Sequence, residues 1–174
     1  CYYTMEYIEG GSLMDYVEQT ETYTLQEEEA LKIIREVASA LSAMHRHRMN
    51  HLDVKPENIL MSEEGKAVLI DFGAAHKFSN DDEASSLLAI TSGGFSPLEI
   101  GKIKDFSPST DIYSLGATLY WLLTGEEPPR EGLSERDEKP ECISDKVWKV
   151  LSLSLQTFRE DRPQSIEEFL ALLD

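Results

Sequence analysis

The sequence has few cysteines and no long apolar run. Its two cysteines, Cys1 and Cys142, fit neither a disulfide framework nor a metal-ligand spacing. We therefore expect a reducing compartment, the cytoplasm. The longest apolar stretch, IYSLGATLYWLL at 112–123, is too short to cross a bilayer. Composition argues against a disulfide-rich secreted protein and against membrane insertion of this segment.

Positive charge is also scarce: 16 Lys and Arg stand against 33 Asp and Glu, for a net charge of −17. Such a chain repels nucleic-acid phosphates and anionic membranes, so neither is an expected partner. The acidity suits basic protein or peptide partners, although acidic chains often owe it to solubility alone. Apolar residues make up 41% of the 174 residues, which is enough to form the buried core of one domain or of one large lobe.

One long helix is indicated between Leu25 and Arg48. Apolar residues recur there with a period near 3.6, at Leu31, Ile34, Val37, Ala38, Leu41 and Met44. Acids crowd its first turn and bases its end, which suits the helix dipole. The bases HRHR at 45–48 are interpreted as solvated groups at the helix C-terminus rather than as a metal site.

The remaining pattern predicts mostly helices and one hairpin. Ser12 is expected to cap a short helix, LMDYVEQ, and NILM and AVLI to pair across the turn SEEGK. Residues 72–106 show no period and read as a long loop. A further helix, 109–125, is apolar nearly all round, with Ser109 as its cap and Gly125 as its stop. Two shorter helices are expected at about 144–156 and 165–173.

The first residues, CYYTMEYI, read as an apolar strand without a partner before it. Because an isolated strand cannot satisfy its own backbone groups, we expect its partners to lie upstream of Cys1.

The stretch HLDVKPENIL, residues 51–60, contains the most distinctive chemistry. Asp53, Lys55 and Asn58 lie in a loop shaped by Pro56, so their side chains could converge on one point. Asp71 follows at the end of a predicted strand. Carboxylate and amide oxygens are ligands that Mg²⁺ accepts together with substrate phosphates. A metal clamp, a cation and a proton acceptor are the groups that phosphoryl transfer needs.

The chain resembles the C-terminal lobe of the eukaryotic-type protein kinase family through four motifs that occur in the family's order: HLDVKPEN, DFG, GFSPLE and DIYSLGATLYWLLTG. The resemblance covers essentially the whole chain. It implies a mainly α fold, α+β overall, with a short hairpin beside the catalytic loop and the N-terminal lobe absent. The implied divisions are the last N-lobe strand and hinge at 1–8, the C-lobe at 9–174, the catalytic loop at 51–58, the activation segment at 71–99 and the central helix at 109–124.

The resemblance also implies roles. Asp53 matches the acid that receives or orients the substrate hydroxyl's proton, Lys55 the lysine on the transferred phosphate, and Asn58 and Asp71 the two magnesium ligands. A lysine at position 55 resembles the pattern of the serine/threonine-specific branch of that family. The other implied residues are Met5, Glu6, Ile8, Ser12 and Leu60 at the nucleotide; His51, Phe72, Gly73, Glu99, Asp111 and Arg162 in structural or regulatory positions; and Ser92 or Thr91 in the substrate pocket.

Each residue also has an ordinary interpretation. Asp53 and Asp71 could be turn and cap residues, Lys55 a solvated lysine, and Asp111 a first-turn helix acid. Glu99 and Arg162 could form an ion pair that is purely structural.

The chain departs from the family pattern in three places. Leu52 replaces the arginine usual before the catalytic acid, so phosphorylation of Ser79, Ser85, Ser86 or Thr91 is not expected to be the main on-switch. The closing motif is SPLE rather than APE, a form seen in some bacterial members. No GxGxxG loop and no upstream strand lysine occur.

The resemblance implies an ATP- and Mg²⁺-dependent serine/threonine kinase as the parent protein, with this piece inactive alone. One alternative is a pseudokinase or interaction module, which Leu52 and SPLE leave open; another is a small-molecule kinase of related fold. Apolar surface around the hinge, Leu60 and Phe72 is expected to bind the missing lobe or a second copy.

Overall fold

The structure is a computed structural model that describes residues 7–77, 93–98, 106–129, 131–133 and 137–174. Helices dominate this part of the chain, as the sequence predicts. They are α1 (Leu13–Glu18), α2 (Glu27–Arg46), α3 (Pro108–Thr124), α4 (Asp145–Ser154) and α5 (Ile166–Leu172). The strands are short: β1 (Met49–Asn50), β2 (Ile59–Met61), β3 (Ala67–Leu69) and β4 (His76–Lys77). The prediction of a mainly α fold with a small hairpin is confirmed.

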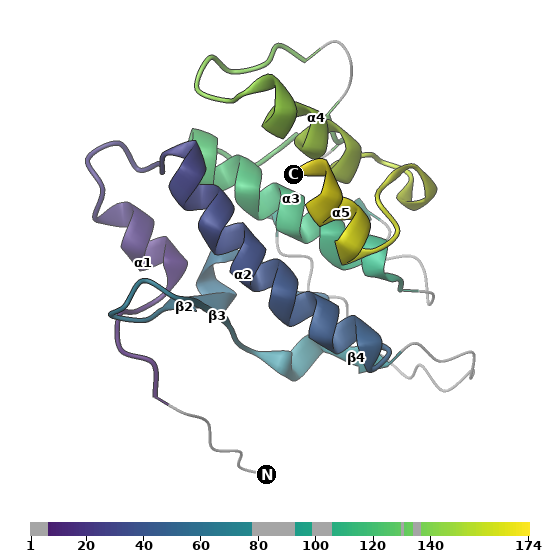
Figure 1. Cartoon of the computed structure of the whole chain (residues 1–174), viewed down its shortest axis with the longest axis horizontal. Helices are drawn as coiled ribbons and strands as arrows, with labels where there is room; N and C mark the ends of the chain where they lie inside the picture. The colour runs from purple at the N-terminus through teal and green to yellow at the C-terminus, as the bar shows by residue number, and fades with distance from the viewer. Residues whose placement is uncertain (1–6, 78–92, 99–105, 130, 134–136) are drawn as a thin grey trace.

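Helices α2 and α3 form the centre of the molecule. They lie side by side; α4 packs against α3, and α5 packs against α2 as well as against α3 and α4 (Figure 1). The buried face of α2 carries Ala30, Ile33, Ile34, Val37, Ala38 and Leu41, which confirms the helical period. Helix α3 is buried at every position from Ser109 to Leu119, because neighbours cover it on several sides.

The start of α3 differs from the prediction. Ser107, not Ser109, is the N-cap residue, with extended φ of −134° and ψ of 168°, and its N–H donates to Thr110 Oγ1 at 3.4 Å. Pro108 then takes the first helical position, where its missing N–H has no consequence. Ser109 lies inside the first turn and is fully buried. The predicted stop is confirmed, since Gly125 adopts a left-handed φ of +74°.

The predicted hairpin is present beside α2. Strands β2 and β3 pair antiparallel, with Ile59 opposite Leu69, and Ala67 N–H donates to the Glu36 carboxylate of α2 at 2.6 Å. A second pair, β1 with β4, was not predicted from the sequence. Strands of two residues are too short to show an alternating pattern.

The chain enters the fold along this hairpin. Residues 1–6 of the predicted opening strand lie outside the described part, and Tyr7 and Ile8 are not in a strand. Gly11 O accepts from Met61 N–H at 2.9 Å, and Ser12 then caps α1 as expected. Among the described residues, no helix is long and apolar enough to span a membrane.

Candidate active site

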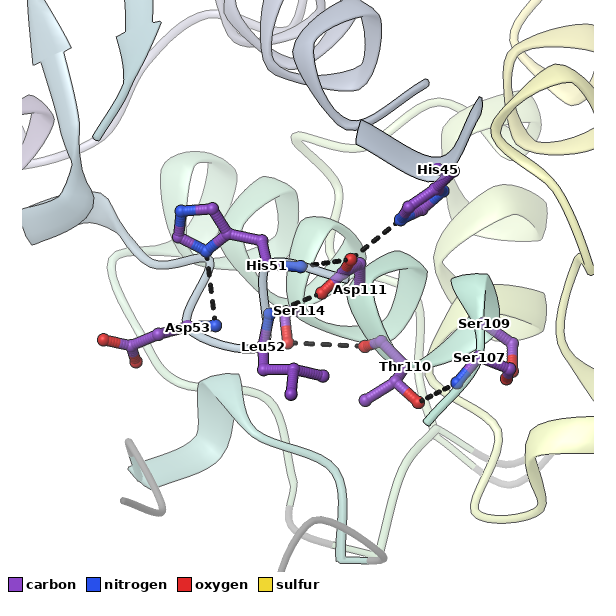
Figure 2. Close-up of polar contacts among 9 residues, drawn as sticks. All are labelled: His45, His51, Leu52, Asp53, Ser107, Ser109, Thr110, Asp111 and Ser114. Atoms are coloured by element: carbon purple, nitrogen blue, oxygen red, sulfur yellow. Dashed lines mark hydrogen bonds and ion pairs between the residues drawn. The ribbon is translucent and has the colours of Figure 1, made fainter. Parts of the chain in front are cut away.

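The loop at 51–58 is fastened to α3 by one buried carboxylate. Asp111, in the first turn of α3, accepts the backbone N–H of His51 at 2.9 Å and that of Leu52 at 2.8 Å (Figure 2). Its side chain is fully buried. Because buried N–H groups need acceptors, the carboxylate fixes where the loop begins. The family resemblance implied a structural or regulatory position for Asp111, that of the acid that holds the backbone of the catalytic loop.

A third donor reaches Asp111 from α2. His45 Nε2 lies 2.8 Å from Asp111 Oδ2, and only 9% of the His45 side chain is exposed (Figure 2). The interpretation of HRHR as solvated bases is therefore wrong for His45. The signal was available in the sequence, because His45 follows the buried Leu41 by four residues and so shares its helix face.

Leu52 has an unusual backbone conformation for a leucine. Its φ is +67°, in the left-handed region, which costs about 1–2 kcal/mol for a residue with a Cβ. Its side chain is buried and its N–H is held by Asp111. Such strain persists where the surroundings hold it, and it concentrates at functional sites. Here it lies directly before Asp53.

Three of the predicted residues converge within the loop. The Asn58 amide nitrogen donates to Asp53 O at 2.8 Å and to Asp53 Oδ2 at 2.7 Å. Lys55 Nζ lies 3.0 Å from the same Oδ2. The Asp53 and Lys55 side chains are 14% and 19% exposed, so the ion pair is partly shielded from water. The structure brings together an acid, an amide and a cation, as the spacing of HLDVKPEN suggested.

Asp71 reaches the same region through the backbone of the preceding residue. Ile70 N–H donates to Asn58 O at 2.9 Å, and Ile70 O lies 3.0 Å from His51 Nε2. His51 Nδ1 accepts Asp53 N–H at 3.3 Å, so His51 connects Asp53 with the residue before Asp71 (Figure 2 draws the Asp53 bond). Asp71 itself has a left-handed φ of +63° and accepts Gly73 N–H at 3.0 Å.

The donor groups suit a hard divalent cation. Both side-chain hydrogen bonds of Asn58 within the described part use its amide nitrogen, which leaves the side-chain oxygen Oδ1 as the ligand atom. Asp71 is exposed and adds a carboxylate. Over the described ranges no group of three or more His, Cys, Asp or Glu side chains is placed to hold a metal. A pair of oxygen ligands fits Mg²⁺, which usually shares its shell with water and substrate phosphates.

Phe72 packs on the loop from outside. Its ring meets that of His51 edge to face, with centroids 5.6 Å apart, and Phe72 is 56% exposed. Leu60 is half-buried and Gly73 exposed. Apolar surface at Phe72 was expected from the sequence.

The Ser12 side chain caps helix α1. Its hydroxyl donates to Asp15 Oδ2 at 2.6 Å and accepts Asp15 N–H at 3.1 Å, which caps α1. The Ser12 hydroxyl and backbone N–H lower the pKa of Asp15. Ile8, also predicted to lie at the nucleotide, is half-buried. The other predicted residues of the nucleotide, closing and substrate positions lie outside the described part: Met5, Glu6, Thr91, Ser92 and Glu99.

Arg162 is buried between α3 and the loop before α5. It donates to Gln156 O at 2.7 Å, to Thr157 O at 3.0 Å and to Ser109 O at 3.3 Å. Its guanidinium lies 4.9 Å from the centre of the Tyr113 ring. Arg162 therefore fixes that loop to the start of α3, whereas its predicted pairing with Glu99 stays a prediction.

Comparisons with known proteins agree with the geometry. The family model for the protein kinase domain matches residues 1–173. "Probable serine/threonine-protein kinase PknB" of Lactococcus lactis is 33% identical over 127 residues, which are 73% of this chain and 20% of the relative. Myosin light chain kinase 2 of Rattus norvegicus is 39% identical over 126 residues, 71% of this chain and 20% of the relative.

A third relative matches over more of the chain. "Probable serine/threonine-protein kinase DDB_G0284251" of Dictyostelium discoideum is 30% identical over 169 residues, 93% of this chain and 34% of the relative. The chain thus spans between about a fifth and about a third of the length of these three relatives.

Proposed function

Because this chain belongs to the protein kinase domain family, we propose that its full-length protein transfers the γ-phosphoryl group of ATP to serine or threonine side chains of proteins. One observation carries the proposal: Asp53, Lys55 and Asn58 converge at 2.7 and 3.0 Å in a loop fastened to α3. The proposal concerns the full-length protein, since the chain spans only part of its relatives.

Asp53 is the proton acceptor in this proposal. The substrate hydroxyl oxygen forms a bond to the γ-phosphorus, the bond from that phosphorus to the ADP oxygen breaks, and the hydroxyl proton passes to Asp53. The amide of Asn58 fixes the Asp53 carboxylate, so its orientation is set before substrate binds. The anchor at Asp111 sets the loop backbone in the same way.

Lys55 supplies positive charge beside the proton acceptor. Its ammonium is already 3.0 Å from Asp53 Oδ2, which places a cation next to the position where the transferred phosphate would carry charge. Fixed positive charge at that point stabilises the transition state more than the ground state.

Asn58 and Asp71 are proposed to hold Mg²⁺ through their side-chain oxygens. Mg²⁺, when bound, neutralises charge on the ATP phosphates. The hydrogen bonds of Asn58 already turn its carbonyl oxygen away from Asp53, and Gly73 N–H steadies Asp71.

Activity is proposed to be independent of a phosphate on the segment 71–99. Leu52 is buried and carries no charge, so position 52 cannot pair with a phosphorylated residue. Phosphatase treatment of the full-length protein should then leave the rate within about 3-fold, an energy change of less than about 1 kcal/mol. A rate that falls 100-fold and returns with phosphorylation would contradict this.

The test is phosphate transfer by full-length protein, with Asp53→Asn as the critical variant. The amide keeps the shape of the side chain but is a poor base, so the rate should fall by about 100-fold or more. Asp145→Asn is the matched control, because Asp145 is an exposed first-turn acid of α4. Its rate should equal that of the wild type.

Two other outcomes would replace the proposal. Equal transfer by wild type and Asp53→Asn defeats the assignment of Asp53, and no transfer by an ATP-binding wild type supports an interaction module. Transfer to sugars or aminoglycosides but not to a basic serine peptide indicates a small-molecule kinase.

A further inference from the structure

A buried asparagine joins the strand before the loop at 51–58 to the start of α3. Asn50, the last residue of β1, is fully buried, and its side-chain amide lies against the backbone of Ser107. One orientation of the amide pairs both of its groups: the nitrogen donates to Ser107 O at 3.2 Å, and the oxygen accepts Ser107 N–H at 3.2 Å. Because Ser107 is the N-cap residue of α3, Asn50 binds the turn that carries Asp111.

An amide suits this position because it matches a peptide backbone. The Asn50 side chain offers one donor group and one acceptor, and the Ser107 backbone presents the complementary pair. Among the described residues, the other acceptor of Ser107 N–H is Thr110 Oγ1, at a longer 3.4 Å (Figure 2). A fully buried amide is unfavourable unless it is paired, so the contact with Ser107 accounts for a polar residue at position 50.

Asn50 and Asp111 make reciprocal contacts between the same two segments. The Asp111 side chain of α3 accepts the backbone N–H groups of His51 and Leu52. In the opposite direction, the Asn50 side chain binds the backbone of Ser107 at the start of α3. A single carboxylate would let the loop pivot about it, whereas two contacts made in opposite directions also fix the rotation of the loop against α3.

His51 links this pair of contacts to Asp53. It directly follows Asn50, and its Nδ1 accepts Asp53 N–H at 3.3 Å. The backbone of Asn50 also pairs with His76 of β4, on the chain that leads away from Asp71. A shift of Asn50 would therefore move the backbone on which Asp53 is placed.

We propose that Asn50 is a positioning residue for phosphoryl transfer, acting through His51 and Leu52 on the placement of Asp53. The inference rests on the proposed function. Because Asn50 is fully buried, it is not accessible to a peptide substrate. Its loss should misplace the proton acceptor, which lowers kcat, and should leave the KM values for ATP and for the peptide nearly unchanged.

The test measures kcat and both KM values in full-length variants, at a temperature where circular dichroism shows each variant folded. Asn50→Leu is close in size but cannot pair with Ser107, so kcat should fall about 10-fold, with both KM values within about 3-fold. Asn50→Asp keeps the shape but loses the donor, and kcat should fall about 3-fold or more.

Thr118→Val is the control for these variants. It removes a buried hydrogen bond inside α3 itself, from Thr118 Oγ1 to Ser114 O at 2.8 Å. Its kcat should equal that of the wild type. Asn50→Ser, a smaller change, carries the same kinetic test if Asn50→Leu does not fold.

Four kinetic results would overturn the inference. Wild-type kcat in Asn50→Leu would show that the contact is only structural, and an equal fall in Thr118→Val would trace the loss to general loosening of α3. Wild-type kcat in Asn50→Asp would show that the donor to Ser107 O is not needed. A raised KM with unchanged kcat would place the effect in binding.

A measurement on the wild-type full-length protein needs neither catalysis nor a variant. The side-chain amide protons of Asn50 should exchange with water at least about 10-fold more slowly than those of the exposed Gln19. Exchange as fast as at Gln19 would defeat the contact with Ser107. A wild type without phosphate transfer would instead defeat the proposed function.

Discussion

Helix α3 holds a loop at each end through a carboxylate, and the two anchors differ in burial. Asp111, in its first turn, is fully buried and accepts from His51, Leu52 and His45. Glu127, just past its last turn, is exposed and accepts from Gly94 alone among the described residues. The first anchor fixes the loop that carries Asp53, and the second fixes the 3₁₀ turn η3 (Gly93–Phe95).

The difference decides what each carboxylate contributes. Removing a buried acceptor leaves buried N–H groups without a partner, which costs about 1–3 kcal/mol for each. Removing an exposed acceptor lets water take its place, so the free energy of unfolding changes little. The same interaction can therefore be essential to the core at one end of a helix and contribute little to stability at the other.

Asp111→Ala should produce the largest effect. It leaves the N–H groups of His51 and Leu52 unpaired in the core, and Leu52 loses the bond that holds its strained φ. We expect the free energy of unfolding to fall by about 3 kcal/mol or more, measured by urea denaturation. Asp145→Ala, the matched first-turn acid of α4, should cost less than about 0.5 kcal/mol. Equal losses in both variants would end the distinction between the anchors.

His45→Phe should produce the next effect. The ring is similar in shape but has no donor, so Asp111 Oδ2 keeps only the bond from His51 N–H. We expect a loss of about 1–2 kcal/mol in the free energy of unfolding, and recovery of part of it in His45→Gln, which restores an N–H. A His45→Phe variant as stable as the wild type would mean that the backbone donors alone set the anchor.

Glu127→Ala should lower stability far less than Asp111→Ala. Because Glu127 is exposed, we expect a loss below about 1 kcal/mol in the same denaturation experiment. If Glu127→Ala proved as costly as Asp111→Ala, exposure would not be what separates the two anchors.

Ser42→Ala should produce the smallest effect, and one that depends on pH. The pKa of Glu167 is lowered from its ordinary 4.5, first by the backbone N–H of Glu167 itself and second by the Ser42 hydroxyl, which donates to Glu167 Oε1 at 2.8 Å. A carboxyl group whose pKa is lowered by folding stabilises the protein at pH values above its unfolded-state pKa. This stabilisation is lost as the pH falls through the folded-state pKa. The difference in melting temperature between wild type and Ser42→Ala should thus shrink from pH 7 to about pH 3.

Ser152→Ala is the control for that experiment. The Ser152 hydroxyl donates to the Trp148 carbonyl at 2.8 Å, a contact without a titrating group. Its effect on the melting temperature should not change over the same pH range, and a parallel change in both variants would remove Glu167 as the cause.

Much of the fold could be predicted from periodicity, because helices such as α2 repeat a pattern over many residues. Short features could not. The two-residue strands β1 and β4 are too short to show a period. The N-cap of α3 is Ser107 rather than the predicted Ser109, because Pro108 can occupy the first position of a helix. His45 was assigned to solvent because its charge was weighed and its place on the buried face was not.

Less of the candidate site than of the fold could be predicted from sequence pattern alone. Composition and spacing suggested only that Asp53, Lys55 and Asn58 could converge; their roles came from the family resemblance. Glu127 was not predicted, since nothing in the sequence links it to Gly94, 33 residues away. Contacts of that kind depend on the packing of α3 and appear only when the fold is known.

The most direct test of the central claim is a single-turnover measurement of γ-phosphate transfer to a serine peptide, with ATP and Mg²⁺ bound to the full-length protein beforehand. The account predicts a chemical step at least about 100-fold slower in Asp53→Asn than in the wild type, with Asp145→Asn unaffected. Identical rates in all three proteins would contradict it.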